Sequence, residues 1–235
     1  IALNPDYADA HLNLGSILSD LGKLQEAEVS TRKAIEINPD SAEGNFNLGN
    51  ILIGLGDLQE AESSYRKAIK LKPEYTVAHL NLGSVLSDLD KAQEALDSYM
   101  QVIKINPNHS NIYNLITNLL RDSSPYYFNK SQLKEILNLL LEKDNIPHKE
   151  LSKMFSYLYG NELIVSLKRF ESDFFKKESF KLFINDEPII NALKKIPLRD
   201  FKLEEILTKA REYICHQIAG NKEEINYHRL KFILA

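Results

Sequence analysis

The sequence predicts an all-α protein, a solenoid of stacked helix–turn–helix units followed by an irregular helical domain. Three observations lead to this prediction. One pattern of residues begins at Ala8, Ala42 and Thr76, which gives a period of 34 residues. Within each copy the apolar residues keep the spacing of an α-helix. After residue 123 the period is lost, while the helical spacing continues without strand-like alternation. A strict long period marks a solenoid, in which each unit buries its apolar face on its neighbours.

Each unit contains two helical runs separated by a short turn. Gly22 and Gly56 lie between the runs, where the end of a helix often needs a left-handed residue. Asp57, followed three residues later by Glu60, is typical of the start of the second helix. A proline then ends each unit because proline cannot continue a helix, and these prolines are Pro39, Pro73 and Pro107.

A glycine occupies the middle of each first helix, at Gly15, Gly49 and Gly83. Glycine there costs about 1 kcal/mol relative to alanine. A repeated cost of this kind indicates that the second helix approaches closely at that point. The small residues expected to face these glycines from the second helix are Ala27, Ala61 and Ala95.

These positions resemble the tetratricopeptide repeat (TPR) family. Counted from Ala8, Ala42 and Thr76, the glycines fill the family's small position 8, the alanines its position 20 and the prolines its position 32. The departures are few, and they are His11, Asn45 and His79 in place of an aromatic residue, Asp90 in place of a turn glycine, Val102 in place of an alanine and Thr117 at the small position of the partial repeat.

The resemblance extends over residues 1–122 and implies a right-handed superhelix. It divides the chain into the tail of one repeat at 1–7, full repeats at 8–41, 42–75 and 76–109, a partial repeat at 110–122 and a helical C-terminal domain at 123–235. The chain begins with the tail of a repeat and ends at Ala235 within a helical pattern that has no cap, so we expect a piece of a longer protein. A protein of this class is expected to bind a protein or peptide segment, to need no cofactor and to have no catalytic site of its own.

The resemblance also implies that the first helix of each repeat lines a concave groove. The groove residues expected from it are Leu12, Asn13, Ser16, Ser19 and Asp20, then Phe46, Asn47, Asn50, Ile53 and Gly54, then Leu80, Asn81, Ser84, Ser87 and Asp88. Asn13, Asn47 and Asn81 stand in register, like the asparagine ladder of the O-GlcNAc transferase superhelix. An amide can both donate to and accept from a peptide group. Such a row either binds the main chain of a ligand or bonds to neighbouring helices, and the sequence leaves both possibilities open.

Charge and composition narrow the expected ligand. Residues 1–122 carry 10 basic and 17 acidic residues, whereas residues 123–235 carry 19 and 16. Position 2 of the three repeats holds Asp9, Glu43 and Val77, so the basic clamp by which some members of the family bind acidic peptides is disfavoured. A neutral or basic segment is favoured. His11 and His79 lie two repeats apart, so they are expected to pack between helices and not to bind a metal.

The second half offers little chemistry. Lys130–Lys143 and a run that follows Pro147 are predicted helices. Cys215 and His216 are adjacent, so they point to different faces, and the basic, aromatic stretch 168–183 is interrupted by acids, which disfavours a nucleic-acid site. Residues 191–212 resemble the helical segment that joins TPRs to a methyltransferase in some bacterial proteins.

The remaining alternatives follow from these features. In the first alternative, the chain is the substrate-recruiting and linker part of a larger S-adenosylmethionine-dependent methyltransferase-type enzyme. In the second, it forms a homo-oligomer through an uncapped solenoid end. A single cysteine fits a reducing compartment, and no apolar stretch is long enough for a membrane span, so a cytoplasmic protein is expected. The resemblance of residues 191–212 implies a bacterial one.

Overall fold

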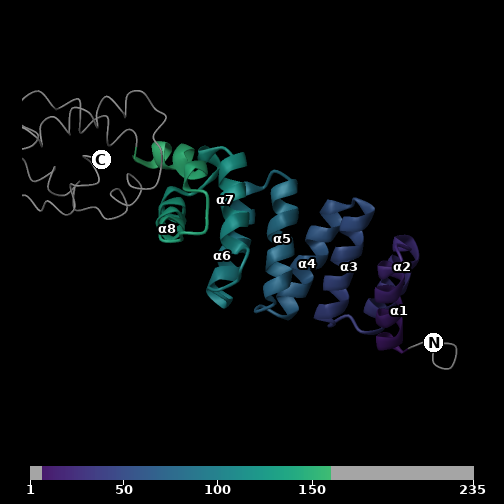
Figure 1. The fold of residues 1–235 in the computed structure, drawn as a ribbon. Helices are drawn as coiled ribbons and strands as arrows, with labels where there is room; N and C mark the ends of the chain where they lie inside the picture. Colours follow the sequence, from purple (N-terminus) through teal and green to yellow (C-terminus); the bar gives the residue numbers. More distant parts are fainter. Residues whose placement is uncertain (1–6, 160–235) are drawn as a thin grey trace, which may run out of the picture. The chain divides into compact units, whose positions relative to one another are not determined.

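The computed structural model describes residues 7–159, and all regular structure in that range is helical (Figure 1). The predicted all-α fold with helix–turn–helix repeats is therefore confirmed for this part of the chain. The chain divides into two compact units, Ile1–Ile112 and Tyr113–Ala235.

The first unit consists of three helix pairs that follow one another along the chain. The pairs are α1 (Ala8–Asp20) with α2 (Leu24–Ile37), α3 (Ala42–Leu55) with α4 (Leu58–Leu71), and α5 (Thr76–Asp88) with α6 (Ala92–Ile105). Each helix packs on the next one in sequence, and α1 also contacts α3. The first helices α1 and α3 are therefore neighbours across a repeat joint, as a stack of repeats requires.

The turns between paired helices use left-handed residues, as the sequence predicted. Gly22 has φ of 73° and Gly56 has φ of 85°. Asp90, at the corresponding place in the third repeat, adopts φ of 59°, a region that aspartate tolerates better than most residues. The Asp57 side chain accepts a hydrogen bond from the Glu60 backbone amide at 3.0 Å, which confirms the predicted start of α4.

The structure explains the mid-helix glycines: a tyrosine ring lies nearest to Gly49 and to Gly83, whereas Thr31 and the carbonyl oxygen of the expected Ala27 lie nearest to Gly15. A Cβ on Gly49 would lie 2.6 Å from a ring carbon of Tyr65, and a Cβ on Gly83 would lie 2.4 Å from the same carbon of Tyr99. Ala61 and Ala95 are fully buried, yet the atoms nearest the glycines belong to the two tyrosines. The close approach thus admits an aromatic ring between the paired helices.

Ion pairs connect successive second helices. Arg32 on α2 contacts Glu28 on its own helix and Glu60 on α4, and Arg66 on α4 contacts Glu62 and Glu94 in the same way. All of these side chains are partly exposed, and pairs of this kind contribute little each. Burial of apolar side chains on the neighbouring repeats is therefore the main stabilising term of the stack.

The second unit is described as far as residue 159. Its elements are α7 (Ile112–Asp122), which crosses the unit boundary, the 3₁₀ turns η1 (Pro125–Tyr127) and η2 (His148–Leu151), the helix α8 (Lys130–Leu141) and the helical residues 152–159. The predicted apolar face of α8 is confirmed, and its buried residues are Leu133, Ile136, Leu137, Leu140 and Leu141. Thr117, which replaces the small residue in the partial repeat, is buried and donates its hydroxyl to the Tyr113 carbonyl at 2.8 Å.

The remaining expectations for the second half, including Cys215, His216, the stretch 168–183 and the segment 191–212, lie outside the described residues.

The Gly49→Ala substitution tests how tightly the tyrosine ring is held. We expect it to destabilise the protein by about 1–2 kcal/mol, because overpacking against the buried ring of Tyr65 outweighs the helix propensity gained. The matched control is Gly54→Ala in the same helix, where the new Cβ meets only the end of the flexible Leu24 side chain. Urea unfolding followed by circular dichroism measures both changes, and an equal effect of the two substitutions would contradict this account.

Candidate functional site

The candidate site is the row of polar side chains along the first helices α1, α3 and α5. Asn13 and Asn50 are exposed, while Asn47 and Asn81 are partly exposed. Hydrogen bonds that join α1 to α3 and α3 to α5 show that the side chains of Ser16, Asn47, Asn50 and Asn81 share one side of the stack, whereas Asn13 makes no such bond among the described residues. The structure therefore brings together Asn47 with Ser16, and Asn81 with Asn50.

The amides of the asparagine row bond to the preceding repeat. The Asn81 amide nitrogen Nδ2 donates to Oδ1 of Asn50 at 2.9 Å, and Nδ2 of Asn47 lies 3.4 Å from the Ser16 hydroxyl. Of the two possibilities left open by the sequence, bonding to neighbouring helices is thus present for both residues. Each of these bonds uses a hydrogen of the amide nitrogen, which leaves the carbonyl oxygen of both residues, and the second N–H of Asn47, for a ligand.

Tyr65, on the second helix α4 of its pair, joins this network from the buried side. The Tyr65 hydroxyl donates to Oδ1 of Asn50 at 2.6 Å and lies 3.4 Å from Nδ2 of Asn81. In the third repeat Tyr99 shares a hydrogen bond of 3.2 Å with Ser84, which occupies the position of Asn50. Burial raises the pKa of Tyr65 to about 12, against a smaller opposing effect of the hydrogen bond from Asn81. The hydroxyl therefore keeps its proton at neutral pH and acts as a donor.

The first repeat lacks this arrangement. Thr31 stands where the later repeats have tyrosine, and its hydroxyl is buried without a hydrogen-bond partner among the described residues. Ser16 donates to the Leu12 carbonyl at 3.2 Å instead. The polar row is consequently ordered most firmly at the joint between the second and third repeats.

The apolar residues predicted for the groove are Leu12, Phe46 and Leu80, and all three are partly buried. The Phe46 ring lies 5.0 Å from the ring of Tyr75 and 5.8 Å from that of Tyr65. Such centroid distances are typical of favourable aromatic pairs. Phe46 therefore belongs to an aromatic cluster at the second repeat.

Sequence reasoning missed three tyrosines of this region, Tyr65, Tyr75 and Tyr99. A signal for two of them was present, since Tyr65 and Tyr99 hold the same position of successive repeats. The spacing placed them on the second helix, and nothing in it indicated that their hydroxyls reach the first-helix polar residues.

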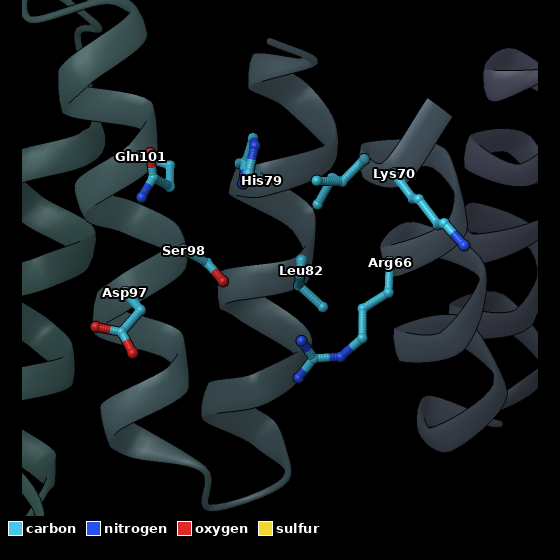
Figure 2. Close-up of a pocket in the computed structure, with 8 residues that line it drawn as sticks. Arg66, Lys70, His79, Leu82, Asp97, Ser98 and Gln101 are labelled. Atoms are coloured by element: carbon cyan, nitrogen blue, oxygen red, sulfur yellow. The ribbon is translucent and has the colours of Figure 1, made fainter. Parts of the chain in front are cut away.

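A second concavity lies outside this row. An open cleft of about 340 Å³ is formed between α4, α5 and α6 (Figure 2), and its lining residues are Arg66, Ile69, Lys70, His79, Leu82, Asp97, Ser98 and Gln101. His79 is buried, and its Nε2 bonds to the Pro73 carbonyl at 2.9 Å, which confirms that it packs between helices. Ser98 donates to the Glu94 carbonyl at 3.0 Å. His79, Ser98 and Arg66 all bond within the chain, so we interpret the cleft as part of the packing between repeats.

Two features are absent from residues 7–159. Within them, no three or more His, Cys, Asp or Glu side chains are grouped as a metal site would require. No helix in the same range has the length and apolar character needed to cross a membrane.

Three segments of the chain match family profiles, and all three profiles describe the same repeat. The sequence profiles described as tetratricopeptide repeat match residues 8–41, 42–75 and 77–109. The comparison with curated proteins gave no match.

Similar solved structures include YrrB, a TPR protein with an unusual peptide-binding site, which is 21% identical with a TM-score of 0.55 over 83% of this chain and 87% of its own. MamA is 26% identical with a TM-score of 0.49, over 50% of this chain and 69% of its own. The first TPR domain of human RPAP3 is 25% identical with a TM-score of 0.47, over 49% and 91%. The likeness to YrrB shows a shared fold.

The raised pKa of Tyr65 predicts a stability loss in alkali. In the unfolded chain the phenol titrates near 10, so between pH 10 and 12 the unfolded state releases the proton first and stability falls as pH rises. From about pH 9 to about pH 11 we expect the wild type to lose about 1 kcal/mol more stability than Tyr65→Phe. Urea unfolding at both pH values measures the difference, and identical losses would show that Tyr65 titrates normally.

Proposed function

Residues 8–41, 42–75 and 77–109 are tetratricopeptide repeats, and on this basis we propose that the chain is a non-catalytic scaffold that binds a protein or peptide segment along α1, α3 and α5. The observation that carries the proposal is the polar row on these helices. Asn47 and Asn81 recur in register and are tied to Ser16 and Asn50 of the preceding repeat. A row of amides at a fixed spacing suits an extended main chain, whose peptide groups also recur at a fixed spacing.

The charge of these helices supports a neutral or basic ligand. The sequences of α1, α3 and α5 contain no lysine or arginine, while Asp9, Asp20, Glu43 and Asp88 on them are exposed. Carboxylates of this kind attract a cationic segment and repel an acidic one, and the attraction weakens with added salt.

Binding of peptides tests this function directly. A peptide library with neutral, basic and acidic members is titrated against the wild type and against an Asn13/Asn47/Asn81→Ala triple variant. We expect basic or neutral peptides to bind to the wild type. Their affinity for the triple variant should be about tenfold lower or more, because several hydrogen bonds are lost. An Asn38/Asn108→Ala double variant, altered in exposed residues outside α1–α6, serves as control and should bind as the wild type does. Unchanged affinity in the triple variant would remove the asparagine row from the binding site.

One observation favours a second candidate function, self-assembly through the N-terminal end of the stack. The exposed fractions of Leu14, Ile17 and Leu21 on α1 are 36%, 57% and 67%. Their counterparts one repeat later, Leu48 and Ile51, are only 5% and 2% exposed because the preceding repeat covers them. An apolar face of the same kind on α1 could pair with a second copy.

Light scattering over a concentration range tests the second candidate. If α1 mediates assembly, the apparent mass rises with concentration in the wild type and stays monomeric in Ile17→Lys, which places a charge on the exposed face. A wild type that remains monomeric at every concentration would sink this candidate and leave the peptide-binding proposal intact.

The methyltransferase-type alternative depends on residues 191–212 and on sequence beyond Ala235, so a cofactor-binding domain in the longer protein would be its test.

A further inference from the structure

We infer that the N-terminal end of the stack binds a second copy of this chain through a two-fold interface, in which the α2 helices of the two copies lie antiparallel. Glu26 of each copy then pairs with Lys33 of the partner subunit, and Lys23 pairs with the partner's Glu36. This inference rests on the second candidate function, self-assembly, and adds the helix that each copy presents, its direction and the side chains that select it.

A cavity at this end of the stack marks a place for a further helix. It is open, has a volume of about 410 Å³ and is lined by residues of α1 and α2. Five of its lining residues recur two repeats later around the cleft of Figure 2, and the pairs are His11 with His79, Leu14 with Leu82, Val29 with Asp97, Ser30 with Ser98 and Lys33 with Gln101. In that cleft the opposite wall is α4, which contributes Arg66, Ile69 and Lys70. The cavity of the first repeat has no such wall among the described residues.

Apolar side chains at this cavity are open to solvent. Leu14 and Val29 line it and are 36% and 70% exposed, and the exposed Ile17 lies one turn further along α1. In the third repeat, where α4 covers the corresponding place, Leu82 is only 4% exposed. A partner helix in the cavity removes apolar surface from water, which stabilises the contact by about 25 cal/mol per Å². Apolar burial thus supplies affinity, but it does not decide which helix binds.

The charges of α2 and of its N-cap residue Lys23 distinguish between partner helices. They form two exposed pairs within one chain, Lys23 with Glu26 at 3.4 Å and Lys33 with Glu36 at 3.2 Å. In both pairs the base precedes the acid, and the two pairs lie at equal distances along the sequence from the midpoint between residues 29 and 30. Each charge therefore has a charge of opposite sign at the same distance on the other side of this midpoint.

Such a pattern is complementary to itself when two copies lie antiparallel. With the midpoints of the two α2 helices facing each other, Lys33 stands level with Glu26 of the partner subunit, and Lys23 stands level with the partner's Glu36. The two-fold axis repeats each contact, so both kinds of pair occur twice. Glu26, Val29 and Lys33 have the spacing i, i+3, i+7, so the ionic and the apolar contact share one face of the helix. A parallel pair in register would instead place each charge beside its own copy, which is repulsive.

A head-to-tail contact between copies is less well matched. In the stack, a second helix gives an arginine to a glutamate of the next one, as Arg66 of α4 does to Glu94 of α6. Glu26 holds the position of Glu94 in the first repeat, and α6 carries the buried Met100 at the position of Arg66. An α6 helix of a second copy would therefore offer no charge to Glu26, whereas an antiparallel α2 offers Lys33.

Reversal of one charge at a time tests this arrangement. Sedimentation equilibrium measures the dissociation constant of the dimer for the wild type, for Glu26→Lys and for Lys33→Glu. Each substitution places like charges at both copies of the central contact, so we expect the dissociation constant to rise about tenfold or more. In an equimolar mixture of the two variants, each reversed side chain can meet the other one, and we expect the affinity of the wild type to return.

The matched control is Lys67→Glu. Lys67 is exposed on α4 and holds the position of Lys33 one repeat further from the end of the stack. The same change of charge there should leave the dissociation constant unchanged, because α4 lies outside the proposed contact.

The mixture of variants decides whether the helices pair as inferred. Single variants that dimerise like the wild type, or a mixture that dimerises no better than the single variants, would overturn the inference. A wild type that grows beyond a dimer would also contradict it, because a two-fold contact closes on itself. If Ile17→Lys disrupts the dimer while both charge reversals leave it intact, self-assembly stands and only the antiparallel arrangement is lost. A wild type that stays monomeric at every concentration removes both and leaves the peptide-binding proposal.

Discussion

The missing Cβ of Gly49 and Gly83 is the constraint on which the first unit depends. It allows the rings of Tyr65 and Tyr99 to lie between paired helices, where a methyl group would overlap them. The same rings are buried in the cores of the second and third pairs, and each carries a hydroxyl to a polar residue of the first helix. Glycine is unfavourable in a helix, yet at these two positions it permits the packing of the tyrosine ring and, through the hydroxyl, the hydrogen bonds to Asn50 and Ser84.

Contacts between repeats use two different chemistries on the two helices of each pair. First helices are linked by short polar bonds, such as that from Asn81 to Asn50, while second helices are linked by Arg–Glu pairs such as Arg66 with Glu94. Neither kind contributes much free energy alone, because hydrogen bonds and exposed ion pairs are partly offset by lost hydration. Both have demanding geometry, so they fix the register in which the apolar faces stack.

The 34-residue period predicted the paired helices and the turns at Gly22 and Gly56, and the helical spacing of apolar residues predicted the apolar face of α8, because these depend on local spacing and on backbone preference. It was not sufficient to identify the partner of Gly49, which we expected to be Ala61 and which is Tyr65. A repeat position tells which side of a helix a residue occupies. The direction of an amide depends on every hydrogen-bonding group around it, so the roles of Asn50 and Asn81 required coordinates.

The uncovered apolar face of α1 has a consequence for the dynamics of the stack. In a linear array each repeat is stabilised by its neighbours, and α1 and α2 have a described neighbour on one side only. Among the described residues, opening of the first repeat therefore breaks one joint, whereas opening of the second breaks two. Amide hydrogens in α1 would therefore exchange with solvent through smaller fluctuations than those in α3. The two helices carry parts of the same polar row but differ in the free energy needed to open them.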